Sequence, residues 1–535
     1  MPGTTQELSS ADRAGARPEW ATTPCRSAGG MELPRQTVAP VPEIKAGVAT
    51  TAPQSTPDSA ACRLLFAAWL CYLLFAPTLG FDWIESWHNE QRALELILLG
   101  GTAAVFVFAM TIPAFRARLP RLQWPILAIL ALGCLSATRA PFPAAAFAEI
   151  ALHMLLVVLI MVAAATVAAD PERGQQAVRH AALLLLGAYV AGVTARYASA
   201  VAMRDPLSID VALFGYANPR FPSALHALLM PFVAALAIDA AQRRSVRAAA
   251  FTVLALIWTI NLALGTRAIW FAYGAAFGTL WLLPTRRCIG ALARATGAAA
   301  LVGIAGYLLL FKLLPAWSGI GEHIAQRSLD QLMWGSNREL LIRSSVDAIL
   351  GSPWLGLGPM QFAAIPGVWA AHPHNWILQL GSEWGLPALL LALYALGRTV
   401  RRLVAQIAPV GASGSPAAVV PLCAGLIALY YGLVDGNLVM PVSQSAAAIV
   451  FGCVLGSVGA RSRTSPEAVA GPRRSTAPRR LWIAIALVAA TAQLFWFTLQ
   501  TLPAAMEREA THRVYAPEML WPRFWSDGFV AVRKP

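Results

Sequence analysis

The stretch AAAFAEIALHMLLVVLIMVAAATVA, residues 144–168, decides the fold class of this chain. A helix rises about 1.5 Å per residue, so a helix over this stretch can cross the apolar core of a bilayer, which is about 30 Å thick. About a dozen other segments share this apolar character, at roughly 63–80, 93–113, 122–138, 181–203, 222–240, 248–264, 268–284, 296–314, 385–397, 416–434, 442–459 and 481–500. The sequence therefore predicts an all-α, polytopic membrane protein with about 12 to 13 transmembrane helices.

Composition supports a membrane protein and argues against two other classes. Apolar residues make up 57% of the 535 residues and charged residues only 13%, whereas soluble domains carry about 25% charged residues. The net charge of +14 resides in short arginine clusters between the apolar segments, a pattern that orients membrane proteins. A soluble multi-domain enzyme and a nucleic-acid-binding protein are therefore both disfavoured.

The arginine clusters also predict the orientation of the chain. They fall in alternate connections, at residues 116–121, 173–179, 243–247, 286–294, 398–402 and 461–480. Loops rich in Arg and Lys stay on the cytoplasmic side of the membrane. The other connections are acidic or neutral by comparison, as in residues 81–92, and are expected on the periplasmic side.

Three regions lie outside the pattern of closely spaced spans. Residues 1–60 are rich in Pro, Ala, Thr and Ser and are predicted to be a disordered cytoplasmic tail, with Met31 as an alternative start of translation. Residues 315–384 are predicted to form one long periplasmic loop within the transmembrane domain, 61–500. Residues 501–535 mix polar and aromatic side chains and are expected to be a periplasmic or interfacial C-terminal tail.

The long loop carries signs of ordered structure. Residues 336–339, Ser-Asn-Arg-Glu, fit a capping box, and residues 340–350 continue with a helical apolar pattern. Gly351 and Pro353 are expected to end this helix. Further along, Pro373 suits the first position of another helix, which places the two residues after it in the first helical turn.

Two arginines stand at the outer rim of the predicted bundle. Arg267 lies between two spans that are joined by only a few residues, and Arg220 directly precedes another span on the same side. A guanidinium group binds phosphate oxygens in a bidentate manner, so the pair is suited to holding a pyrophosphate. The alternative interpretation is structural: a rim arginine that extends to water or caps a helix.

His374 is the main candidate for a general base. At a helix N-terminus the positive end of the dipole disfavours the imidazolium, which keeps the ring able to accept a proton. A loop histidine bonded to the backbone is the alternative. His372 is a weaker second candidate. Asp435 lies where a span meets the outer face, either to assist His374 or to partner an arginine.

Two further arginines, Arg338 and Arg343, belong to the helix predicted in the long loop. Substrate contact is one interpretation, but Glu339 and Arg343 are also spaced for an ordinary ion pair on a helix surface. The sequence contains no Walker loop, dinucleotide fingerprint in context, HExxH motif or CxxC pair. It therefore predicts neither a cofactor nor a metal. None of the seven cysteines falls in the loops expected on the periplasmic side, so no disulfide framework is expected.

Four short motifs resemble the O-antigen ligase and polymerase superfamily. They are residues 374–385, which begin His-Asn and end in Gly; residues 336–359, with Ser-Asn-Arg and later Gly-Ser-Pro-Trp-Leu-Gly-Leu-Gly-Pro; Asn218-Pro219-Arg220; and Thr266-Arg267. The resemblance covers about residues 60–460. The chain departs from the family pattern at Ala268, where glycine is common, and in having more predicted spans than the usual twelve.

This resemblance implies a glycan transferase whose donor is an undecaprenyl-pyrophosphate-linked glycan. It implies metal-independent, inverting transfer on the periplasmic side of a bacterial inner membrane. In this reading Arg220 and Arg267 hold the pyrophosphate and His374 deprotonates the acceptor hydroxyl. Asn218 and Asn375 belong to the same motifs and are expected to support the site.

Three acceptors remain open. A lipid A-core acceptor defines an O-antigen ligase, which the single dominant loop favours. A growing glycan defines a polymerase, and a pilin serine or threonine defines a protein O-oligosaccharyltransferase. Membrane lipids are expected partners and nucleic acid is not. A transporter or flippase is the non-enzymatic alternative, but the sequence lacks the internal duplication that many transporters show.

Overall fold

The structure is a computed structural model of the chain. It describes residues 57–77, 84, 86–120, 124–216, 218–283, 285–320, 338–368, 370–411, 419–461, 477–515 and 522–528. The chain divides into two units, Met1–Gln54 and Ser55–Pro535, and all described residues belong to the second. The tail predicted at residues 1–60 therefore lies outside the described residues, except for its end, where the first helix begins at Pro57.

The described residues fold almost entirely into helices, and none of them forms a β-strand. The α-helices are α1 (Pro57–Phe75), α2 (Trp87–Ala109), α3 (Pro113–Arg118), α4 (Trp124–Ala137), α5 (Pro143–Ala169), α6 (Pro171–Met203), α7 (Arg220–Ile238), α8 (Arg244–Ala263), α9 (Ala268–Leu282), α10 (Arg286–Leu308), α11 (Leu314–Ser318), α13 (Arg338–Gly351), α14 (Trp376–Trp384), α15 (Leu386–Gly411), α16 (Val419–Tyr431), α17 (Pro441–Arg461) and α18 (Ala477–Tyr515). Short helical turns are η1 (Ile209–Ala212), η2 (Leu309–Leu313) and η3 (Gln361–Ala364).

Seven helices within the described residues are long and apolar enough to cross a membrane: α2, α5, α6, α7, α8, α18 and the continuous helix Ile289–Ser318. Five shorter apolar helices, in α1, α4, α9, α16 and α17, accompany them. The prediction of an all-α, polytopic membrane protein is confirmed. α15 belongs to neither group, because Arg398, Arg401 and Arg402, which were expected in a loop, lie within this helix.

Small residues allow α5 and α17 to pack closely at the centre of the bundle. α5 also contacts α1, α2, α4 and α18. On α17, a Cβ atom added to Gly452 would lie 2.5 Å from Cβ of Ala163. One added to Gly456 would lie 2.6 Å from the carbonyl oxygen of Ala164. A larger side chain at either glycine would force the helices apart, so these glycines permit the close approach that is typical of helix pairs in membranes.

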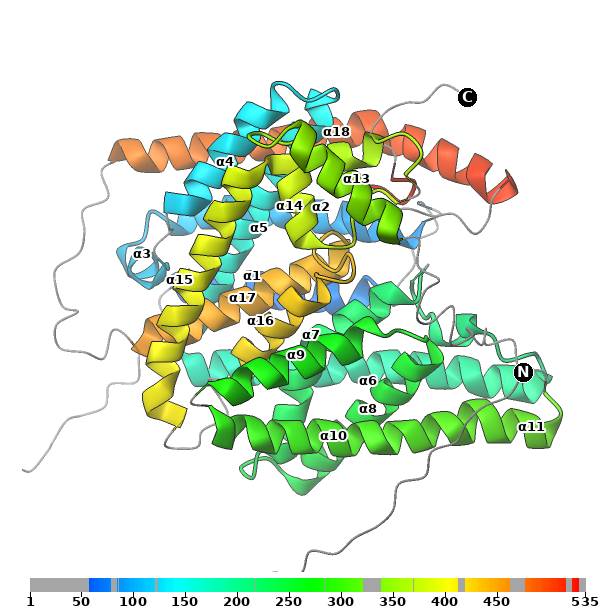
Figure 1. Ribbon diagram of the computed structural model, residues 1–535. Coiled ribbons are helices and arrows are strands. Elements are labelled where there is room, and N and C mark those ends of the chain that lie inside the picture. The colour runs from blue at the N-terminus through cyan, green and yellow to red at the C-terminus, as the bar shows by residue number, and fades with distance from the viewer. Residues whose placement is uncertain are drawn as a thin grey trace, which may run out of the picture. The chain divides into compact units, whose positions relative to one another are not determined.

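α7 is the most deeply buried of the seven long apolar helices, with 83% of its apolar window inside the structure. It packs against α6, α8, α9, α10, α16 and α17. Figure 1 shows α7 to α10 in green, with α16 and α17 above them and α2, α5 and α18 beyond. Because α7 is surrounded by other helices, its first residue, Arg220, is held at one end of the bundle.

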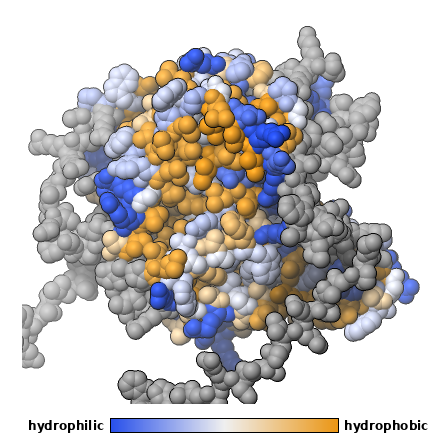
Figure 2. Space-filling model, in the orientation of Figure 1, coloured by the Kyte–Doolittle hydropathy of each residue, from blue (hydrophilic) through white to orange (hydrophobic). Residues whose placement is uncertain are grey.

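Several basic residues lie toward one end of the bundle. α3, which contains Arg116 and Arg118, and the basic half of α15 lie toward the left of Figure 1. α11, where the predicted long loop begins, lies toward the right. Figure 2 shows a broad hydrophobic area on the face turned toward the viewer. Exposed side chains such as Trp124 and Leu390 belong to the apolar surface of the protein, which suits contact with lipid.

The C-terminal part of the chain differs from the expectation of an interfacial tail at residues 501–535. α18 continues to Tyr515 instead of ending near residue 500. Residues 522–528 are buried, and Arg523 and Trp525 are each only 2% exposed. The difference arises because the polar groups of this segment find partners inside the protein, as described below.

Candidate functional site

The turn before α7 places Arg220. Asn218 Oδ1 accepts a hydrogen bond from the backbone N of Arg220 at 3.0 Å, a side-chain-to-backbone turn for which asparagine is well suited. The Tyr431 hydroxyl donates to the Arg220 carbonyl at 3.3 Å and connects this turn to α16. The side chain of Arg220 is 35% exposed, so its guanidinium is accessible from outside the bundle.

Arg267 is the residue before α9, in the short turn that the sequence predicts. Gly265 has a φ of 63°, a left-handed conformation that glycine adopts without strain, and it allows α8 and α9 to connect closely. Thr266 Oγ1 shares a buried hydrogen bond of 2.7 Å with Ser223 Oγ of α7. This bond ties the turn that carries Arg267 to the first turn of α7, where Arg220 lies.

His374 lies just before α14 rather than in its first turn. The predicted helix start at Pro373 is wrong, because Asn375 caps the helix instead. The Oδ1 atom of this cap accepts hydrogen bonds from the backbone N of Ile377 at 2.9 Å and of Leu378 at 3.1 Å. His374 has a φ of 54°. Such a conformation is uncommon outside glycine, and residues held in it cluster at functional sites.

Asp435 lies between α16 and α17 and faces both His374 and Arg220. Its Oδ1 atom is 3.4 Å from His374 Nδ1, and its Oδ2 atom is 4.0 Å from Arg220 Nε. Burial raises the pKa of Asp435, but the neighbouring His374 and the charge of Arg220 together hold that pKa below its usual value. Asp435 is therefore a carboxylate at neutral pH.

Arg338, the first residue of α13, adds another guanidinium group. Its Nη2 atom donates to the Val434 carbonyl at 2.8 Å, directly before Asp435. Burial lowers its pKa, the carboxylate of Asp435 raises it, and the positive charges of Arg220 and Arg267 lower it. Arg338 therefore lies near enough to Arg220 and to Arg267 for their charges to act on it. We call Arg220, Arg267, Arg338, His374 and Asp435 the rim cluster.

Two predicted candidates have other positions. His372 is buried, and its Nδ1 atom accepts a hydrogen bond from the backbone N of His374 at 3.2 Å. Burial, followed by nearby positive charges, holds the pKa of His372 well below its usual value, so it supports the turn as a neutral ring. Arg343 is exposed on α13. Although both side chains are described, it forms no ion pair with Glu339 of the kind that the sequence predicted.

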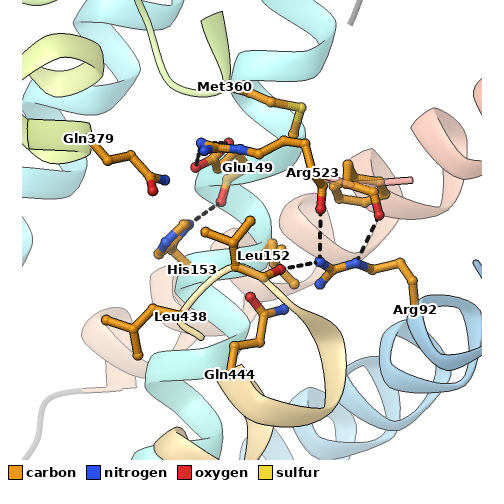
Figure 3. A pocket seen from close by; sticks show the side chains of 11 residues that line it. Arg92, Glu149, Leu152, His153, Met360, Gln379, Leu438, Gln444 and Arg523 are labelled. Carbon is orange, nitrogen blue, oxygen red and sulfur yellow. Dashed lines mark hydrogen bonds and ion pairs between the residues drawn. The ribbon is translucent and has the colours of Figure 1, made fainter. Parts of the chain in front are cut away.

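A second group of charged residues, which no motif indicated, lies in the interior. Arg523 Nη2 is 2.6 Å from Glu149 Oε1 and 2.6 Å from Glu383 Oε2. Arg92 Nη1 is 2.5 Å from Glu95 Oε2. None of these five side chains is more than 5% exposed, and we call them the buried network. Figure 3 shows Arg92, Glu149 and Arg523 around a small cavity of about 20 Å³. The available signal was limited to Glu95 and Glu149, which stand within apolar segments, where ionisable residues are costly unless paired.

The rim cluster is suited to binding an anion beside a base. Guanidinium groups form charge-assisted, often bidentate hydrogen bonds with phosphate oxygens. Asp435 faces one nitrogen of the His374 ring at 3.4 Å, and a carboxylate in this position stabilises the imidazolium that forms when the ring takes a proton. Among the described residues, no group of three or more His, Cys, Asp or Glu side chains is arranged to hold a metal ion.

Comparison with known proteins identifies a family domain in the middle of the chain. Residues 250–393 match the family model described as O-antigen ligase. No curated protein matches the chain. The matched stretch contains Arg267, Arg338 and His374, whereas Arg220 and Asp435 lie outside it. Three residues of the rim cluster therefore belong to the matched domain, and the fold brings the other two to them.

Proposed function

We propose, from the premise that this chain carries a domain of the O-antigen ligase superfamily, that it transfers an O-antigen glycan from undecaprenyl pyrophosphate to a lipid A-core acceptor. The family supports a glycan-transferring membrane enzyme that has a lipid-linked glycan and an acceptor as partners. The proposal adds the identity of the donor and acceptor and a site on the periplasmic face of the inner membrane.

The observation that carries this proposal is the pairing of His374 with Asp435 next to Arg220. A diphosphate leaving group needs positive charge where its own negative charge develops. An acceptor hydroxyl needs a base within hydrogen-bond reach. The rim cluster supplies both the positive charge and the base at one end of the bundle. Asp435 lies 3.4 Å from His374 and 4.0 Å from Arg220, so it connects the two groups.

The proposed reaction is a single displacement at the anomeric carbon of the donor glycan. The acceptor hydroxyl oxygen attacks this carbon from the face opposite the diphosphate, the bond from carbon to the diphosphate oxygen breaks, and the anomeric configuration inverts. His374 takes the hydroxyl proton, and Asp435 stabilises the resulting imidazolium. Arg220 and Arg267 bind the diphosphate and stabilise the undecaprenyl pyrophosphate that leaves. The residues of the chain supply the base and the anion site without a metal.

The charge distribution supports a periplasmic position for this site. The basic residues of α3 and α15 lie at the end of the bundle opposite α11 in Figure 1. Basic connections remain in the cytoplasm, which assigns the end with α11, and the long loop that follows it, to the periplasm. A donor carried by undecaprenyl pyrophosphate would present its diphosphate at this membrane surface.

The proposal is tested with the purified full-length chain in detergent, without an ion gradient. Undecaprenyl-pyrophosphate-linked glycan is incubated with lipid A-core, with more lipid-linked glycan, or with a pilin, and products are separated on gels and weighed by mass spectrometry. We expect transfer to lipid A-core. Extension of the lipid-linked glycan would identify a polymerase and modified pilin a protein O-oligosaccharyltransferase. Either result, or the absence of transfer to all three acceptors, contradicts the ligase assignment.

A further inference from the structure

The C-terminal segment 522–528 is built into the interior of the protein. The carbonyl oxygen of Phe524 accepts a hydrogen bond from Arg92 Nε of α2 at 3.1 Å. The backbone N of Ser526 donates to Asn89 Oδ1, on the same helix, at 2.7 Å. Polar groups buried in this way must be paired to avoid a large desolvation cost, so the segment is fixed to α2 along its length.

Arg523 links this segment to the C-terminal end of α14. Its guanidinium bridges Glu149 of α5 and Glu383 of α14, at 2.6 Å from each. Gln379 of α14 faces the same guanidinium and, with its amide oxygen toward Arg523, accepts a hydrogen bond from Nη1 at 2.8 Å. Glu383 Oε1 also accepts a hydrogen bond from the backbone N of Phe362 at 3.1 Å. Arg523 therefore holds α14 and η3 against α5.

Arg92 connects the same segment to the loop that carries Asp435. Arg92 Nη2 donates to the carbonyl of Val439 at 2.6 Å and to that of Arg523 at 3.3 Å. Val439 and Asp435 both lie in the connection between α16 and α17. Figure 3 shows a dashed hydrogen bond from the Arg92 side chain to the main-chain carbonyl of Arg523, whose own side chain points toward Glu149. One guanidinium group thus holds the connection and the C-terminal segment together.

These contacts hold the two elements that carry His374 and Asp435. His374 precedes the cap of α14, and Glu383 lies in the last turn of that helix. At the other end of α14, the backbone N of Trp376 donates to the carbonyl of Gly432 at 2.9 Å, next to the Asp435 connection. A shift of α14 relative to that connection would change the 3.4 Å distance between His374 and Asp435.

We propose that residues 522–528 are a positioning strap for the rim cluster and that Arg523 is its central positioning residue. Arg523 bonds to α14 and to α5, and through Arg92 the segment also holds the Asp435 connection, so it fixes how His374 and Asp435 face each other. The effect on catalysis rests on the proposed function. The mechanical role of residues 522–528, which is to anchor α14 and residues 432–440 locally, does not depend on the proposed function.

The mechanical role is tested by hydrogen–deuterium exchange of the full-length chain in lipid nanodiscs. Arg523→Met removes the ion pairs to Glu149 and Glu383. Arg523→Lys keeps the positive charge but loses the planar guanidinium group that can bond to two carboxylates at once. Arg179→Met, which breaks the ion pair of Arg179 with Asp239 at 3.7 Å, is the matched control. We expect amides of α14 and residues 432–440 to exchange about tenfold faster in Arg523→Met, with a smaller increase in Arg523→Lys and no change in α8.

If α14 and residues 432–440 of Arg523→Met exchanged at the wild-type rate, the proposal that residues 522–528 act as a strap would be wrong. An equal increase in every helix would also contradict the proposal, because it would show that Arg523 acts only on global stability. If Arg523→Met cannot be purified in a folded state, Arg523→Lys provides the same comparison. The control variant is expected to match the wild type in both elements.

The catalytic consequence is tested by separating turnover from donor binding. A misplaced base reduces turnover about tenfold to a hundredfold, whereas the rim arginines still bind the diphosphate. We therefore expect kcat of Arg523→Lys to fall by that amount while Kd for undecaprenyl pyrophosphate stays within about twofold of the wild type. Equal losses in kcat and in affinity contradict positioning. If the wild-type chain transferred no glycan, the proposed function would be wrong. The hydrogen–deuterium exchange data would still test whether residues 522–528 act as a strap.

Discussion

The rim cluster and the buried network are both groups of charged residues in a largely apolar protein, but they differ in exposure and in what they can do. Arg220 in the rim cluster is 35% exposed and is 4.0 Å from Asp435. Arg523 in the buried network is 2% exposed and lies within 2.6 Å of two carboxylates. A guanidinium group whose N–H donors already bond to carboxylates cannot bind a diphosphate, whereas an accessible guanidinium group can. The comparison assigns binding and chemistry to the rim and positioning to the interior.

This difference leads to opposite expectations for substitutions. Removal of an accessible rim arginine, such as Arg220 at 35% exposed, should affect transfer more than folding. Removal of one partner from a buried ion pair leaves an uncompensated charge and destabilises proteins by about 3–5 kcal/mol.

Arg267→Ala should reduce transfer about a hundredfold to a thousandfold, because removing one group that stabilises developing negative charge has an effect of this size. The melting temperature should change little. Arg343→Ala is the matched control, since Arg343 is also an exposed arginine of the outer region but lies on the surface of α13, outside the rim cluster. Transfer rates of the two purified variants provide the measurement. Equal rates would remove the distinction between rim and surface arginines.

Asp435→Asn should slow transfer about tenfold to a hundredfold, because a hydrogen bond to a charged group contributes about 1.5–3 kcal/mol. The amide keeps the size of the side chain but cannot stabilise a protonated His374 in the same way. Asp210→Asn, in the exposed turn η1, is the control. The measured quantity is kcat at saturating donor. A normal kcat for Asp435→Asn would show that the carboxylate only holds the fold.

Glu383→Gln should change how stability depends on pH. Burial, together with the negative charge of Glu149, raises the pKa of Glu383 from 4.5 to about 7, against the opposing charge of Arg523. The folded protein therefore binds this proton more tightly than the unfolded chain. The resulting stabilisation is complete below pH 4.5 and is lost as the pH rises to about 7. It amounts to about 3 kcal/mol.

The measurement is the thermal unfolding temperature in detergent between about pH 4.5 and pH 7.5. In Glu383→Gln, which cannot titrate, the decrease with rising pH should become shallower. Glu172→Gln, at an exposed position in the first turn of α6, should keep the wild-type slope. Identical slopes for all three proteins would mean that Glu383 does not titrate with a raised pKa.

Ser223→Ala should have the smallest effect. It removes the 2.7 Å hydrogen bond to Thr266 that ties the turns of Arg220 and Arg267 together. A hydrogen bond of this kind contributes about 1 kcal/mol, so donor affinity should weaken about fivefold. Thr194→Val, which removes a hydroxyl bonded within its own helix, is the control. Binding of undecaprenyl pyrophosphate measures the effect, and an unchanged Kd would show that the two turns hold their spacing without this bond.

Much of the fold and part of the rim cluster follow from local sequence features. Apolar length alone indicates the membrane helices, as in residues 144–168. Arg220 and Arg267 stand beside spans at positions where asparagine, proline or glycine marks a tight turn, so their location at one end of a bundle is predictable. The sequence offers both Arg338 and Arg343 for substrate contact. That Arg338 lies next to the Asp435 connection depends on how α13 packs against it.

Two differences between the predicted and observed helices have local causes. Two start signals compete at residues 373–375, and the asparagine cap prevails over the proline. The expected span at residues 385–397 is the first half of α15, which continues through three arginines because helix propensity does not end at a charge. Glu149 and Arg523 are distant in sequence, and each alone is an isolated charge. Only packing brings them together, so no pattern in one sequence reveals the pair.

The central claim is that His374 removes the acceptor proton at the rim cluster. Single-turnover transfer with donor and lipid A-core both saturating isolates this step from binding. His374→Ala should be slower than the wild type by about a hundredfold to ten-thousandfold. His180→Ala, which removes a half-buried ring that bonds within α6, should react at the wild-type rate, and the product should have inverted anomeric configuration. Wild-type single-turnover rates for His374→Ala, or a product with retained configuration, would contradict the account.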